Sequence, residues 1–66
     1  MTRTLTVRQQ QVLMLMADGL TQEEIAGNLF ISRSTVENHT NEIIGRLGAR
    51  NSANAIAIAF RLKLLE

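Results

Sequence analysis

Cysteine and proline are absent from this sequence, and its only aromatic residues are two phenylalanines. Without cysteine the chain can form no disulfide and has none of the Cys/His groupings that hold structural zinc. With a single histidine and no glycine-rich phosphate loop, it also offers no nucleophile–base pair, so we expect no enzyme activity, no cofactor and no metal. Because glycine is sparse as well, no stretch has the composition of a linker.

A long apolar run is also missing. No segment approaches the roughly 18 apolar residues of a membrane span, and the first residues lack the apolar core of a signal peptide. We therefore expect a soluble, cytoplasmic chain with no membrane partner. The hydrophobic fraction of 45% argues against disorder, and a length of 66 residues leaves room for one domain, residues 1–66. A net charge of +1 neither indicates nor excludes a nucleic-acid partner.

Helix start and stop signals predict an all-α four-helix bundle without strands. The helices are expected at about residues 7–18, 22–29, 33–47 and 53–65. Thr6 and Thr21 each precede a Gln or Glu by three residues, which is the capping-box pattern. The remaining signals are an N-cap at Ser32, another at Asn51 or Ser52, and the stop glycines Gly19 and Gly48.

Only Phe30, Ile31 and Ser32 separate the second helix from the third. Two helices joined by so short a turn, the second of them longer and polar on its outer face, form the pattern of a helix-turn-helix unit. Any small helical bundle could show the same spacing, so the pattern alone leaves DNA binding and a purely structural role equally open.

A longer ordered series of motifs resembles the LuxR-type helix-turn-helix domain, also called the GerE or NarL type. The series is LTVRQ (5–9), VL (12–13), GLT (19–21), EIA (24–26), LFIS (29–32), STV (34–36), NH (38–39), LG (47–48) and Ala55. Each piece is weak alone, but their order and intervals together are specific. The resemblance implies four helices, the third in the major groove and the fourth pairing two subunits, in a cytoplasmic regulator that binds inverted-repeat promoter sites. It also implies that a receiver or ligand-sensing domain usually precedes this module.

The outer face of the third helix carries the candidate base-reading residues. With Val36, Ile43 and Leu47 turned inward, the opposite stripe at three- and four-residue steps consists of Ser34, Glu37, Asn38, Asn41 and Gly45. An Asn side chain can bond adenine N6 and N7 together, although a solvated surface Asn is the plain alternative. Gly45 either permits close approach to DNA or is merely tolerated within the helix, at about 1 kcal/mol relative to Ala.

Phosphate contacts are expected around this stripe. The candidates are Thr21, Arg33, Thr35, Arg46 and Arg50. Arg46 and Arg50 can equally interact with the carboxyl end of the third helix. The lone histidine, His39, matches a family position that packs at the helix junction, which makes a structural role the expectation.

Three positions depart from what the resemblance implies. Similar sequences often carry Lys or Arg where this chain has Glu37, so either its site contains cytosine, whose N4 can donate to a carboxylate, or its DNA contact is weak. The family usually has Glu at the position of Gln9, and often a basic residue at that of Ser52. We hypothesise that these two changes remove an ion pair together, which would be roughly neutral.

The fourth helix is apolar on almost every side, so one core-facing surface cannot use all of it. We expect Ala55, Ile58, Ala59 and Leu62 to enter the core, and Ile56, Phe60 and Leu64 to form a homodimer interface. A missing domain could cover the second set instead. The competing function is a protein-interaction module that pairs with another regulator of this type and antagonises it, which the low net charge and Glu37 favour.

Overall fold

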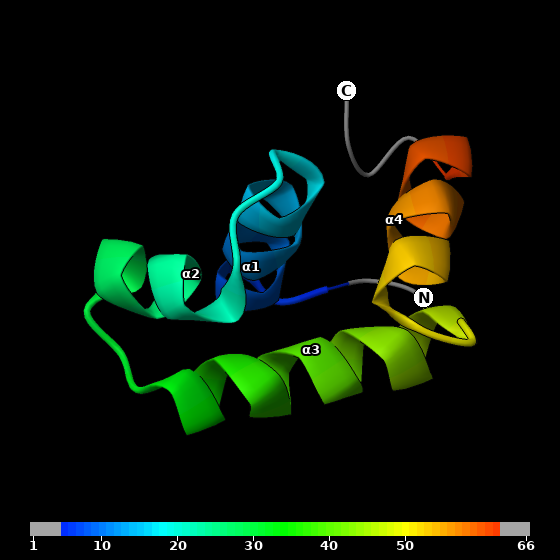
Figure 1. The fold of residues 1–66 in the computed structure, drawn as a ribbon. Coiled ribbons are helices and arrows are strands. Elements are labelled where there is room, and N and C mark those ends of the chain that lie inside the picture. Colours follow the sequence, from blue (N-terminus) through cyan, green and yellow to red (C-terminus); the bar gives the residue numbers. More distant parts are fainter. Residues whose placement is uncertain (1–4, 63–66) are drawn as a thin grey trace.

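The computed structural model describes residues 5–62 and contains four α-helices in that range (Figure 1). They are α1 (Val7–Ala17), α2 (Gln22–Leu29), α3 (Arg33–Leu47) and α4 (Ser52–Arg61), and no strand lies within the described residues. The predicted all-α, four-helix architecture is confirmed, and the bounds of α2 and α3 agree with the expected ones.

The first two helices begin at complete capping boxes. The Thr6 hydroxyl accepts from the Gln9 amide at 3.1 Å, and the Gln9 side chain accepts from the Thr6 amide at 3.1 Å. Thr21 and Glu24 make the same reciprocal pair at 3.2 and 2.8 Å. Both boxes satisfy amides that a helix leaves without an internal partner, which explains why these helices begin where the sequence indicated.

Two helix ends differ from the prediction. Helix α1 ends at Ala17 rather than at residue 18, because Asp18 already forms the C-cap and Gly19 follows at φ +94°. The N-cap of α4 is Asn51, whose side chain accepts from the Asn54 amide at 2.8 Å, so Ser52 is the first helical residue. The expected end of α4 at residue 65 is wrong, since Leu62 is its C-cap; residues 63–65 lie outside the described residues.

Helix α3 contacts each of the other three helices and forms the base of the fold. The core that α3 shares with the other helices contains five fully buried large side chains: Leu13, Ile25, Ile43, Val12 and Val36. Figure 1 shows α1, α2 and α4 on one side of α3, while its opposite side faces away from these three helices. One face of α3 is therefore not covered by any other described helix, as expected for a surface helix with a single apolar stripe.

The turn between α2 and α3 contains an unusual backbone conformation. Phe30 is the C-cap of α2 at φ 58° and ψ 43°, which is the left-handed region, and its side chain is 94% exposed. The next amide, that of Ile31, returns to the Ala26 carbonyl at 3.1 Å and fixes the turn. A bulky residue is rare in this conformation.

Candidate nucleic-acid interface

The proposed base-reading residues lie together on the uncovered face of α3. Ser34, Glu37, Asn38 and Asn41 are all exposed, and so is Gly45 one turn further along. Val36 and Ile43 on the opposite face are fully buried, which fixes the rotation of the helix and therefore the outward direction of the polar row. In Figure 1 no other described helix lies on the side of α3 that faces away from α1, α2 and α4.

A group of hydroxyls closes the amino end of the same face. The Ser32 Oγ accepts from the Thr35 amide at 3.1 Å and lies 2.8 Å from the Thr35 hydroxyl and 3.1 Å from the Ser34 hydroxyl. Ser34 is therefore tied to the helix cap, and its hydroxyl keeps hydrogen-bonding capacity for a further partner. Thr35 is half-buried, whereas Ser32 and Ser34 are exposed.

The candidate phosphate ligands are distributed around both ends of α3. Arg33 is its first residue, Arg46 lies in its last turn, and Arg50 follows in the loop to α4; all three are exposed. The Arg50 amide donates to the Asn54 side chain at 3.0 Å, which orders this loop. Thr21 is exposed at the start of α2, with its hydroxyl engaged in the capping box.

The structure pairs Gln9 with Glu42, a residue that the sequence analysis did not single out. The Gln9 side chain is 2% exposed, and its Nε2 donates to the Glu42 carboxylate of α3 at 2.8 Å. No local signal could have indicated a pair separated by 33 residues. The side-chain hydrogen bonds of Gln9 go to Thr6 and Glu42. The hypothesis that the changes at Gln9 and Ser52 together remove an ion pair stays a hypothesis.

His39 is half-buried on α3 beside the polar row. Its Nδ1 is buried and has no hydrogen-bond partner within the described residues. Gly45 has open space around it, since a Cβ built there would meet nothing within 4 Å. Packing among the described residues therefore does not require glycine at this position.

Helix α4 divides its apolar side chains differently from the expectation. Ala55 and Ala59 are fully buried and Ile58 packs against the core, as expected. Leu62, which was expected in the core, is 39% exposed and lies just past the last helical residue as the C-cap of α4. Of the three expected interface residues, Ile56 packs partly against the core, Phe60 is 49% exposed, and Leu64 lies outside the described residues.

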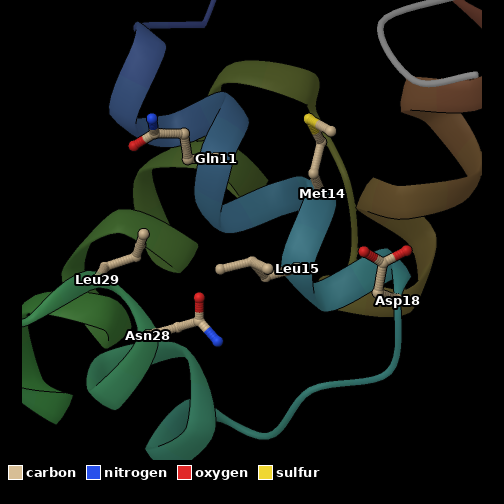
Figure 2. A pocket seen from close by; sticks show the side chains of 6 residues that line it. All are labelled: Gln11, Met14, Leu15, Asp18, Asn28 and Leu29. Carbon is tan, nitrogen blue, oxygen red and sulfur yellow. The ribbon is translucent and has the colours of Figure 1, made fainter.

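A shallow pocket of about 210 Å³ lies between α1 and α2 (Figure 2). Leu15 and Leu29 point into it, with the polar side chains of Gln11, Asp18 and Asn28 around them. None of the proposed base-reading or phosphate-binding residues lines it. Within the described residues, no helix is both long and apolar enough to cross a membrane.

Comparison with known proteins gives consistent results across three levels. Residues 3–59 match the family model described as bacterial regulatory proteins, luxR family. The solved structure of the transcription factor GerE superposes with a TM-score of 0.90 at 32% sequence identity, over 94% of this chain and 92% of that one.

Two relatives have similar sequences over most of the chain. The uncharacterized transcriptional regulatory protein YvfU of Bacillus subtilis is 46% identical over 55 residues, which are 83% of this chain and 28% of that protein. The oxygen regulatory protein NreC of Staphylococcus aureus is 38% identical over 64 residues, or 97% of this chain and 30% of that protein. This chain therefore spans less than a third of the length of either relative. By its family match and its four-helix fold, the chain belongs to the luxR family of bacterial regulatory proteins and is a helix-turn-helix DNA-binding domain of that family.

Proposed function

We propose that this domain binds duplex DNA sequence-specifically by placing α3 in the major groove. The observation that carries the proposal is the uncovered polar row of Ser34, Glu37, Asn38 and Asn41 on a helix whose opposite face is buried. A rigid helix of this width fits the major groove, where each base pair presents a distinct pattern of donors and acceptors. We propose that the domain acts through DNA binding, without a catalytic role.

The side chains divide into two kinds of contact. Asn38 and Asn41, near the centre of the row, are suited to adenine, and Glu37 to cytosine N4. Ser34 reads from the amino end. Phosphates on either side are bound by Thr21, Arg33, Thr35, Arg46 and Arg50, which position the helix without reading sequence. If about three basic groups act per subunit, a dimer neutralises about six phosphates, which gives a log–log salt slope near −5.

We propose a homodimer on an inverted repeat, formed through α4. The exposed apolar side chain of Phe60 and the exposed part of Ile56 support this surface. Leu64, its third proposed member, lies outside the described residues. Isologous pairing of two such helices matches a palindromic site with half-sites about one helical turn apart.

The length of the relatives supports the proposal that this domain is one part of a protein with several domains. Because this chain spans less than a third of their length, we propose that the domain, residues 1–66, works with a receiver or ligand-sensing domain in a cytoplasmic regulator. Phosphorylation or ligand binding in that partner domain would then control whether two copies of α3 reach DNA together.

A second function is favoured by the acidic groups on α3. Glu37 and Glu42 are both exposed there and both repel phosphates. A domain that paired with a related regulator and lowered its DNA affinity would have this property.

One titration separates the two functions. Mixed-sequence duplex DNA is added at about 50 mM salt, where phosphate contacts are strongest, and bound sites are then selected from random sequence. Enrichment of an inverted repeat supports DNA reading. Absence of any binding at this salt concentration would reject it and favour the antagonist.

A further inference from the structure

The amide of Gln9 uses both of its ends in the fold. Its Oε1 accepts from the Thr6 amide at 3.1 Å to complete the capping box of α1. Its Nε2 donates to Glu42 Oε1 at 2.8 Å and joins α1 to α3. Glutamate could supply the first bond but not the second, because it has no donor to offer a carboxylate. The pair therefore requires an amide at position 9 for as long as position 42 carries a charge.

Glu42 lies at the border of the polar row rather than within the core. It follows Asn38 by four residues and precedes Gly45 by three, so both are its neighbours on the helix surface. Arg46 is four residues further along on the same flank. Glu42 is exposed, yet its carboxylate is held by a donor that is itself buried. The negative charge thus has a fixed place at the edge of the face assigned to DNA.

We infer that Gln9 is a positioning residue for DNA binding, which holds the Glu42 carboxylate against α1 and away from the duplex. This inference rests on the proposed function of α3. Released from Gln9, the Glu42 side chain can rotate over Asn38 and Gly45 or toward Arg46. In the first position it faces phosphates and bases, and in the second it competes with phosphate for a guanidinium.

The bond also has a purely structural interpretation, in which it only anchors α1 to α3. The two interpretations predict different losses of DNA affinity when Gln9 is replaced, depending on the charge at position 42. A structural anchor loses the same DNA affinity whether position 42 is charged or neutral. A positioning residue loses affinity only while the charge is present, and salt reduces that loss because screening weakens charge effects and leaves packing effects largely unchanged.

The test is a double-mutant cycle on DNA affinity, with Gln9→Met, Glu42→Gln and the double variant, each titrated with selected duplex DNA at low and moderate salt. Methionine keeps the length of the buried side chain, and Glu42→Gln keeps an acceptor for Gln9. We expect Glu42→Gln to bind about threefold more tightly and Gln9→Met about threefold more weakly, as one displaced charge near phosphates predicts. In the Glu42→Gln background the Gln9 change should have almost no effect.

Gln11→Ala is the control, since this exposed glutamine on α1 lines the pocket toward α2. An equal loss for Gln9→Met in both backgrounds would overturn the inference and leave DNA reading intact. If Gln9→Met fails to fold, Gln9→Asn, whose shorter amide falls short of Glu42, replaces it in the same cycle, with the same two readings. If Asn38→Ala leaves base preference unchanged while the coupling persists, Asn38 loses its role as a base reader, but the position of Glu42 beside bound DNA still holds. A wild-type chain that binds no DNA overturns both the proposed function and the inference.

Discussion

The hydroxyl of Ser32 accepts a hydrogen bond from the backbone amide of Thr35 at 3.1 Å and so caps the helix that carries the polar row. Loss of such a cap costs about 1 kcal/mol of stability. We expect Ser32→Ala to lower the free energy of unfolding by this amount in urea titrations, and to weaken DNA binding because the first turn of α3 holds Arg33 and Ser34.

Ser52→Ala is the matched control for this prediction. Ser52 is also an exposed serine at the start of a helix, but Asn51 makes the capping bond of α4. Its replacement should change stability by less than about 0.5 kcal/mol. Equal effects of the two substitutions would show that the Ser32 hydroxyl contributes no more than an ordinary surface side chain.

The features of the fold that the sequence predicts are those whose signals lie within a few neighbouring residues. Thr6 and Thr21 could be assigned as caps because each capping box is complete within four residues, and Ser32 because a helical apolar pattern follows it directly. The pair of Gln9 and Glu42 has no such signal, since the fold alone brings the two residues together.

Other features of the structure could not be predicted from local sequence signals either. The left-handed cap at Phe30 was missed because Gly and Asn usually occupy that conformation, and the early end of α4 because apolar residues continue past it. The polar row could be listed from helical spacing, but its lack of cover depends on how α1, α2 and α4 pack against α3.

Two helical glycines provide a paired test of the reading face. Gly27 in α2 and Gly45 in α3 are both exposed, and a Cβ meets nothing within 4 Å at either position. We expect each Gly→Ala change to raise the free energy of unfolding by up to about 1 kcal/mol. Only Gly45→Ala should weaken DNA binding, because its methyl group would stand on the face directed at the groove. Equal DNA affinities of the two variants would argue against close approach at Gly45.

The conformation of Phe30 predicts a stabilising substitution. A left-handed conformation costs an ordinary L residue about 1–2 kcal/mol, whereas Asn tolerates it. We expect Phe30→Asn to raise the free energy of unfolding by about 0.5–1 kcal/mol, as a higher midpoint in thermal unfolding. Phe30→Ala removes the ring without relieving the backbone and should gain less. If the two variants were equally stable, backbone strain at this turn would not be the cause.

The proposed dimer predicts a concentration-dependent difference at Phe60. This side chain is half-exposed on α4, so Phe60→Glu should leave the monomer folded while it prevents the apolar surface from pairing. Sedimentation over a range of concentrations should show association of the wild type and none of the variant, and binding to an inverted repeat should lose cooperativity. Arg61→Gln, exposed on a different side of α4, is the control. Association that persists in Phe60→Glu would assign the interface elsewhere.

Base reading and phosphate binding predict different consequences of losing a side chain. Asn38→Ala should lower affinity for the selected site by about 1–3 kcal/mol while leaving binding to mixed DNA almost unchanged, because an Asn contact discriminates between bases. Arg46→Ala should weaken all sites alike and reduce the magnitude of the log–log salt slope by about one per subunit. Fluorescence anisotropy on selected and scrambled duplexes at several salt concentrations separates the two patterns. A uniform loss from Asn38→Ala would reassign that residue to the backbone, and if neither variant lost affinity, DNA would have to approach a face other than the polar row of α3.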